Sequence, residues 1–172
     1  MKIRCSITGP ESSGKTVLTK SLADLYNAQW VPEYARKYLI ENGKDYVQND
    51  LDIIANAQAK EWKALKDSDL VFYDTDFYVL KVWSKVKYDS VSELISNHKS
   101  EQKIDHYFLC LPDIPWEFDE LREHPESRME LFEMYKSYLL KDNCNFTIVS
   151  GSLEKRINTC RSIIDDLISK DS

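Results

Sequence analysis

Glycine and proline are scarce in this chain. Its 172 residues include four glycines and five prolines, so few positions force a break in a helix or strand, and no low-complexity tract or internal repeat interrupts the sequence. The composition, 42% hydrophobic and 30% charged, is that of a globular chain long enough to bury one core. We therefore expect a single domain over residues 1–172.

An excess of positive charge and a long apolar run are also missing. The formal net charge of −6 provides no basic field of the kind that binds nucleic-acid phosphates, so nucleic acid is not an expected partner. No stretch approaches the roughly 18 apolar residues that span a membrane, and the first residues do not follow the pattern of a signal peptide. We expect a cytoplasmic protein with no membrane partner.

The four cysteines lack the spacing of a metal site or a disulfide framework. Cys5, Cys110, Cys144 and Cys160 form no C-x-x-C pair and have no paired histidine. We expect reduced thiols, most of them buried.

Short β-branched or aromatic runs alternate with longer segments of helical period. The expected strands are 2–8, 29–31, 70–74, 106–111 and 146–149. The expected helices are 15–26, 33–41, 50–66, 77–86, 91–100, 125–140 and 153–168. This alternation predicts an α/β fold, with a parallel sheet of about five strands between two layers of helices. Ligands of such sheets bind at the carboxyl ends of the strands, which is where we look for chemistry.

The segment "GPESSGKT", residues 9–16, is the strongest motif in the chain. It satisfies G-x-x-x-x-G-K-[ST] between a predicted strand and a predicted helix, which is the context of the phosphate-binding loop of P-loop NTPases. Gly9 and Gly14 let the backbone curl around an anion, Lys15 supplies a charge for the β- and γ-phosphates, and Thr16 offers a hydroxyl to Mg²⁺. The expected nucleotide-binding residues of this loop are Gly9, Glu11, Ser12, Ser13, Gly14, Lys15, Thr16 and Val17.

The apolar run "LVFYDTD", residues 70–76, ends in two carboxylates. A carboxylate at the end of the strand beside the phosphate loop holds Mg²⁺ in this class of protein, so Asp74, or else Asp76, joins Thr16 as the metal candidate. Asp76 has two interpretations, because it could face the substrate or could cap the helix that follows.

Two other nucleotide-dependent activities lack their motifs. A switch GTPase requires D-x-x-G after this strand and [NT]-K-x-D further on, and neither sequence occurs. Mechanical ATPases place a water-activating glutamate after the metal aspartate, where this chain has Thr75. Transfer of the γ-phosphoryl group to an organic acceptor is therefore the favoured use of the nucleotide.

Two charged segments are candidates for the acceptor side of the site. "DELREHPESR", residues 119–128, carries Arg122 and Arg128, which as lid arginines would neutralise the transferring phosphoryl group; a salt-bridged helical surface is the alternative. "VPEYAR", residues 31–36, spaces Glu33 and Arg36 to face one site, with a surface ion pair as its alternative.

Five segments together resemble one family: "GPESSGKT", "WVPEYARKYL", "YDTDFYVLKVWSKVKY", "DIPWEFDELREHPESR" and "VSGSLEKR". In this order they are similar, over nearly the whole chain, to the ribosylnicotinamide kinase domain of the NadR-type NAD biosynthesis proteins. The resemblance implies a P-loop fold of nucleoside and nucleotide kinase type with an arginine-bearing lid. It also implies ATP- and Mg²⁺-dependent phosphorylation of the 5′-hydroxyl of nicotinamide riboside. The chain lacks the length for the adenylyltransferase and DNA-binding domains of the larger members, so a stand-alone kinase is expected.

Roles on the acceptor side follow from this resemblance. Glu33 is the first choice to accept the 5′-hydroxyl proton, with Asp74 as the alternative, and Arg36 would orient the nucleoside. The cationic nicotinamide ring would attract the aromatic faces of Tyr34, Tyr73 and Trp116. Trp30, Trp62 and Trp83 are expected in the core.

The segment "SGSLEKR", residues 150–156, is expected beside the adenine. Gly151 would allow a close backbone approach and Arg156 would stack on or flank the base; a helix start capped by Ser152 explains the same letters.

Two other functions of the chain stay open. One is a P-loop kinase for another nucleoside or nucleotide, and the other is a nucleotide-binding regulator with little turnover.

Overall fold

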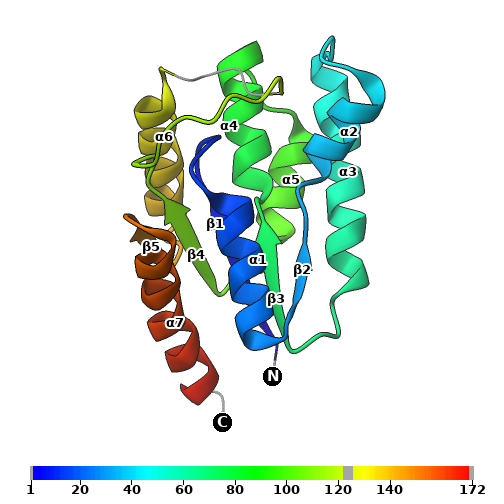
Figure 1. Cartoon of the computed structure of the whole chain (residues 1–172). Coiled ribbons are helices and arrows are strands. Elements are labelled where there is room, and N and C mark those ends of the chain that lie inside the picture. Colours follow the sequence, from blue (N-terminus) through cyan, green and yellow to red (C-terminus); the bar gives the residue numbers. More distant parts are fainter. Residues whose placement is uncertain (1, 122–125, 171–172) are drawn as a thin grey trace.

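The computed structural model describes residues 2–121 and 126–170 (Figure 1). Its sheet has five parallel strands in the order β2-β3-β1-β4-β5. The strands are β1 (Ile3–Thr8), β2 (Gln29–Val31), β3 (Leu70–Asp74), β4 (His106–Cys110) and β5 (Phe146–Val149). The central strands are nearly continuous apolar runs because helices cover both of their faces.

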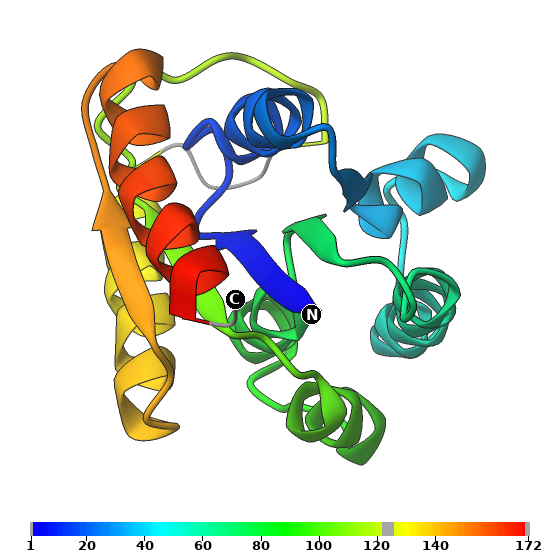
Figure 2. The ribbon, with the colours of Figure 1, turned by 90° about the horizontal axis from the view of Figure 1, so that it is seen from below.

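Helices form a layer on each side of the sheet (Figure 2). They are α1 (Lys15–Tyr26), α2 (Tyr34–Asn42), α3 (Gln48–Ala64), α4 (Phe77–Tyr88), α5 (Glu93–Glu101), α6 (Arg128–Lys141) and α7 (Leu153–Lys170). On one face α1 and α7 pack against alternate residues of β1, including Cys5 and Ile7. On the other face, α3, α4, α5 and α6 cover β3 and β4. The α/β sandwich expected from the sequence is confirmed.

The strand order creates one crevice at the carboxyl edge. Ile7 of β1 pairs with Asp74 of β3, while Thr8 pairs with Leu109 of β4. The chain runs from β1 toward β2 in one direction along the sheet, and from the neighbouring β4 toward β5 in the other. Such a switch point is where α/β sheets bind ligands.

Four helices begin at other residues than expected, and α2 differs by one residue because Glu33 is its N-cap. α3 begins at Gln48 because the Asp50 carboxylate accepts the backbone N–H of Val47 at 2.7 Å. α5 begins at Glu93, since the Ser92 hydroxyl accepts the Ile95 N–H. α6 begins at Arg128, and Pro125, the expected start, lies outside the described residues.

Two expectations about chemical environment can be compared with the structure. Cys5, Cys110 and Cys160 are buried and Cys144 is partly buried, all four as free thiols. Across 2–121 and 126–170, none of the helices has the length and apolar content to cross a membrane.

Candidate active site

The loop after β1 adopts a conformation that requires its glycines. Gly9 has φ 131° and Gly14 has φ 83°, a region that side-chain-bearing residues rarely adopt. A Cβ on Gly9 would lie 2.9 Å from the carbonyl oxygen of Cys110, so the loop passes directly over the end of β4. The following helix begins at Lys15, and its first N–H groups face the loop as an anion site would need.

Thr16 and Asp74 meet at the metal edge predicted from the sequence. The Thr16 hydroxyl donates to Oδ2 of Asp74 at 2.6 Å. Oδ1 of the same carboxylate is buried and has no hydrogen-bond partner in the part of the chain that the structure describes. Burial raises the pKa of Asp74, whereas the Thr16 bond and the Lys15 charge oppose that rise. A buried carboxylate oxygen without a partner, beside a hydroxyl, fits a hard divalent cation such as Mg²⁺.

Asp76 is occupied by the fold. Its Oδ1 accepts the backbone N–H of Tyr78 at 2.7 Å as the cap of α4, and its Oδ2 accepts the Ser6 hydroxyl at 2.7 Å. The side chain is 2% exposed and is not among the described residues that line the site cavity. Of the two interpretations, the helix cap is the one seen, so the substrate-facing place expected for Asp76 is corrected.

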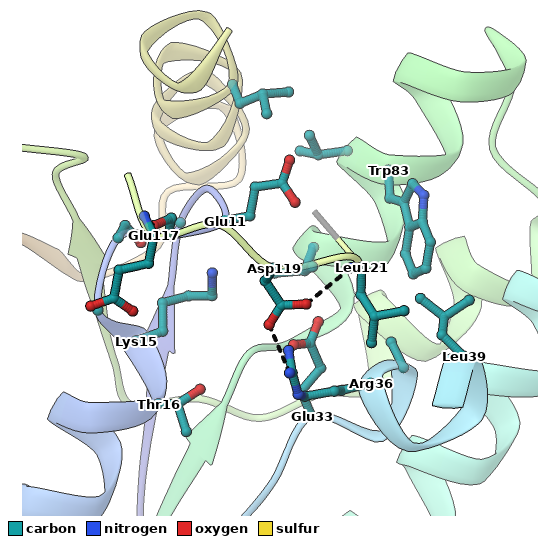
Figure 3. Close-up of a pocket in the computed structure, with 18 of the residues that line it drawn as sticks. Glu11, Lys15, Thr16, Glu33, Arg36, Leu39, Trp83, Glu117, Asp119 and Leu121 are labelled. Atoms are coloured by element: carbon teal, nitrogen blue, oxygen red, sulfur yellow. Dashed lines mark hydrogen bonds and ion pairs between the residues drawn. The ribbon is translucent and has the colours of Figure 1, made fainter. Parts of the chain in front are cut away.

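A cavity of about 430 Å³ opens beside the phosphate loop. Figure 3 shows Lys15 and Thr16 on one side of it and Glu33 on the other, next to Arg36 and Asp119. Trp83, Leu39 and Leu121 form its apolar end. A polar, phosphate-binding side and an apolar end are the two environments that a nucleoside or nucleotide site needs.

Glu33 stands at the N-cap position of α2, where its side chain caps no backbone N–H. It lines the cavity instead. Desolvation by the surrounding protein raises its pKa to about 7, with Lys15 lowering it and Asp74 raising it. A carboxylate with a pKa near the working pH is suited to accept a proton.

Arg36 and Asp119 close one wall of the cavity. Arg36 forms an ion pair with Asp119 at 2.7 Å, and the other oxygen of Asp119 accepts the backbone N–H of Leu121 at 2.9 Å. Asp119 therefore ties the segment after β4 to α2. Asp119 was not among the site residues predicted from the sequence, although it is the first residue of the charged segment 119–128.

Of the two expected lid arginines, the structure describes Arg128. Its guanidinium donates to the carbonyl oxygens of Ser12 and Ile114, each at 3.0 Å, so it touches the phosphate loop. Arg122 lies outside the described residues.

The aromatic residues of the cavity differ from those expected. Among described residues, Tyr34 and Trp116 do not line it: Tyr34 packs on the core under α2, and Trp116 lies under the Arg128 guanidinium at 5.7 Å. Trp83 and Tyr46 line it instead. The indole N–H of Trp83 donates to the Tyr46 hydroxyl at 2.6 Å, and the two rings meet edge to face at 4.9 Å.

The reason is the apolar stripe of α4, which lines the cavity at i, i+3, i+4 and i+7 spacing. Its members are Val79, Val82, Trp83 and Val86. Of these residues, Trp83 was predicted to lie in the core, and a helical period alone cannot tell a cavity wall from a core.

Arg156 braces the phosphate loop from beneath. Its guanidinium donates to the Ser13 carbonyl at 2.6 Å and to the Leu111 carbonyl at 2.9 Å, and it pairs with Asp113. Asp113 also accepts the Gly151 N–H at 2.6 Å. Arg156 is 3% exposed, so neither face of its guanidinium group is open for stacking on a base. The expected role beside the base is replaced by a structural one. Gly151 and Arg156 are not among the residues described as lining the cavity.

Arg156→Lys tests this brace. We expect the KM for ATP to rise about tenfold and the free energy of unfolding to fall by about 1–3 kcal/mol, because an ammonium group cannot make the forked bonds of a guanidinium. Steady-state kinetics and urea denaturation measure the two effects. Arg161→Lys on the exposed face of the same helix is the control and should change neither. A stability loss with an unchanged KM would show that the loop does not depend on Arg156.

Comparison with known proteins places the chain in a family. A family described as an AAA domain matches residues 4–156. The chain belongs to this family. The chain is similar in sequence to a curated relative, the trifunctional NAD biosynthesis/regulator protein NadR of Escherichia coli K12. The two are 26% identical over 96% of this chain. The chain spans 42% of that relative's length.

Solved structures show the same fold for this AAA domain. A NadR protein in complex with NR superposes with a TM-score of 0.80 at 22% identity, over 95% of this chain and 49% of that one. A deoxyadenosine kinase from M. mycoides superposes with a TM-score of 0.70 at 14% identity, over 95% of this chain and 100% of that one. The P-loop fold of nucleoside and nucleotide kinase type is confirmed, as is the resemblance to NadR-type proteins.

Proposed function

We propose that this chain transfers the γ-phosphoryl group of ATP to the 5′-hydroxyl of nicotinamide riboside. The observation that carries a kinase is one cavity lined by the phosphate loop with Lys15 and Thr16 and by Glu33, whose pKa is about 7. Asp74 is not among the described lining residues, but it accepts the hydroxyl of Thr16, which is. The acceptor is supported by the similarity to NadR-type proteins, one of which is described in complex with NR.

Mg-ATP would supply the phosphoryl group and part of its charge neutralisation. The loop N–H groups and Lys15 would orient the β- and γ-phosphates, while Thr16 and Asp74 would hold the metal. Arg128, already bonded to the loop at Ser12, is placed to steady that loop during transfer. Positioning and electrostatics supply most of the catalysis in such reactions.

On the acceptor side, Glu33 accepts the proton of the attacking 5′-hydroxyl. Arg36, held by Asp119 at 2.7 Å, is placed to donate hydrogen bonds to the ribose. The apolar end with Trp83 and Tyr46 receives the base. The face of the Trp83 ring favours a cationic base, whereas the Tyr46 ring already carries the Lys87 ammonium group at 3.5 Å.

A second candidate is a kinase of another nucleoside or nucleotide, since deoxyadenosine and thymidylate kinases share the fold at TM-scores of 0.70. The test incubates the protein with Mg-ATP and a panel of acceptors: nicotinamide riboside, nicotinate riboside, purine and pyrimidine nucleosides, and their monophosphates. We expect ADP formation that depends on nicotinamide riboside. ADP formation with another acceptor alone would support the second candidate, and ATP binding without turnover on any acceptor would indicate a regulator.

The pKa of Glu33 makes a pH prediction. A base must be deprotonated, so kcat/KM should fall about tenfold per pH unit below a pKa of about 7 and level off above it. In Glu33→Gln this limb should disappear and kcat should fall about a hundredfold. ATP ionisation affects both proteins equally, so the difference between the two profiles isolates Glu33. If the limb persists in Glu33→Gln, the base is another group, with Asp74 the next to test.

A further inference from the structure

A second cavity lies away from the phosphate loop. It has a volume of about 400 Å³ and shares no lining residue with the first cavity. Residues from the last turns of α3 and α5 and the first residues of β1 form its walls, on the side of the sheet that α3 and α5 cover. Figure 2 views the molecule from this end, where the N-terminus of β1 lies between the helix layers.

Basic residues dominate the lining of this cavity in a chain that is acidic overall. Five cations, Lys2, Arg4, Lys63, Lys66 and Lys103, face two acids, Glu101 and Asp105. Lys2 pairs with Asp67, whereas Lys63, Lys66 and Lys103 form no ion pair with any residue of the described ranges. A concave surface with unpaired cations concentrates anions.

Arg4 removes an opposing charge from the same place. Its guanidinium donates to the carbonyl oxygens of Leu65 and Lys66, at 3.4 and 2.9 Å. These carbonyls follow the C-terminus of α3, which would otherwise present the negative end of a helix dipole to the cavity. The buried Arg4 cation offsets the negative end of the α3 dipole, so that end of the helix does not repel an anion.

The aromatic wall contains two donors without acceptors. Trp62 stacks on Tyr73 with ring centroids 3.8 Å apart and packs against Phe77 at 5.2 Å, so its indole is fixed. Trp62 is 9% exposed. Its indole N–H is buried and has no hydrogen-bond partner among the residues that the structure describes. Within the same ranges, the Tyr73 hydroxyl has no described hydrogen-bond partner either, although it is not among the fully buried unpartnered atoms. A buried N–H without an acceptor costs about 1–3 kcal/mol and is rare in native proteins.

We propose that this cavity binds an organic anion of nucleotide size, namely a planar ring that carries one phosphate group. A ring acceptor atom would take the indole N–H of Trp62, and the phosphate would lie between Lys63, Lys66 and Lys103. The volume matches that of a small-molecule site, and the combination of aromatic wall, unpaired donors and unpaired cations matches the two halves of such a ligand. The site is separate from the kinase cavity and does not depend on the proposed reaction.

The experiment titrates AMP into ¹⁵N-labelled protein saturated with a non-hydrolysable ATP analogue and Mg²⁺, so that the phosphate loop is filled. The indole resonance of Trp62, assigned by its loss in Trp62→Phe, reports on the site directly. We expect AMP to shift this resonance, and adenosine and inorganic phosphate each to bind at least about tenfold more weakly than AMP. Phosphate that matches AMP would overturn the proposal, because the ring would then contribute nothing.

Charge variants complete the test. Lys63→Glu/Lys66→Glu should weaken AMP binding at least about tenfold, while Lys136→Glu/Lys141→Glu on α6, which has the same net charge and lines neither cavity, should leave it unchanged. Thermal unfolding of both variants confirms that they are folded. Equal affinity in both double variants, or a Trp62 resonance that AMP does not move, would show that AMP does not bind this cavity.

Discussion

Lys15→Ala is expected to lower kcat/KM for ATP about a thousandfold while the protein stays folded. The Lys15 side chain lines the cavity, and its ammonium group donates to the Pro10 carbonyl at 2.7 Å. Because the side chain lies in the cavity and not in the hydrophobic core, its removal should leave no buried void. In the proposed reaction its charge would lie beside the γ-phosphate, and removing one such preorganised charge costs several kcal/mol of transition-state stabilisation. Single-turnover phosphoryl transfer and circular dichroism measure the two quantities.

Lys20→Ala is the matched control, because Lys20 lies on the same helix, outside the cavity, with its ammonium group over the Trp30 ring at 5.4 Å. It should retain wild-type kinetics. Full activity of Lys15→Ala would remove the phosphate-loop mechanism, since no other described lysine belongs to the loop.

Residues fixed by local backbone chemistry were the ones that the sequence could predict. The spacing of Gly9, Gly14, Lys15 and Thr16 specifies a loop conformation and a helix start, and both occur where expected. The end of β3 at Asp74 follows likewise from an apolar run that ends in a carboxylate. These features depend on neighbours in sequence, so one chain is enough to reveal them.

Residues whose place depends on tertiary contacts were harder to predict. Trp83 and Trp116 are both aromatic residues beside charged segments, but α4 turns Trp83 toward the cavity, while Arg128 covers Trp116. Arg156 was predicted to stack on or flank the adenine, but its place depends on carbonyls of Ser13 and Leu111, which are distant in sequence. Sequence spacing carries no information on such long-range partners.

Asp74→Asn separates the metal edge from the fold. The amide oxygen can still accept the Thr16 hydroxyl bond, and the variant no longer buries a charge, so the net cost in stability should be small. The unpartnered Oδ1 is then replaced by an NH2 group, which cannot bind a cation. We expect kcat to fall about a hundred- to a thousandfold and the Mg²⁺ concentration for half-maximal activity to rise, because a neutral ligand holds a divalent cation less tightly. Asp76→Asn should instead lower the free energy of unfolding through its contacts with Ser6 and Tyr78 and leave the Mg²⁺ requirement unchanged. An altered Mg²⁺ requirement in Asp76→Asn alone would exchange the two roles.

The same variants should move the Glu33 titration in opposite directions. Asp74 raises the pKa of Glu33 and Lys15 lowers it, so Asp74→Asn should bring that pKa down from about 7 and Lys15→Ala should take it up. Carboxyl ¹³C NMR of the ligand-free variants measures the shift without relying on their low activity. Shifts of opposite sign would establish that Lys15, Glu33 and Asp74 share one electrostatic site. A titration of Glu33 that neither variant moves would contradict that arrangement, because neighbouring charges must affect each other's ionisation.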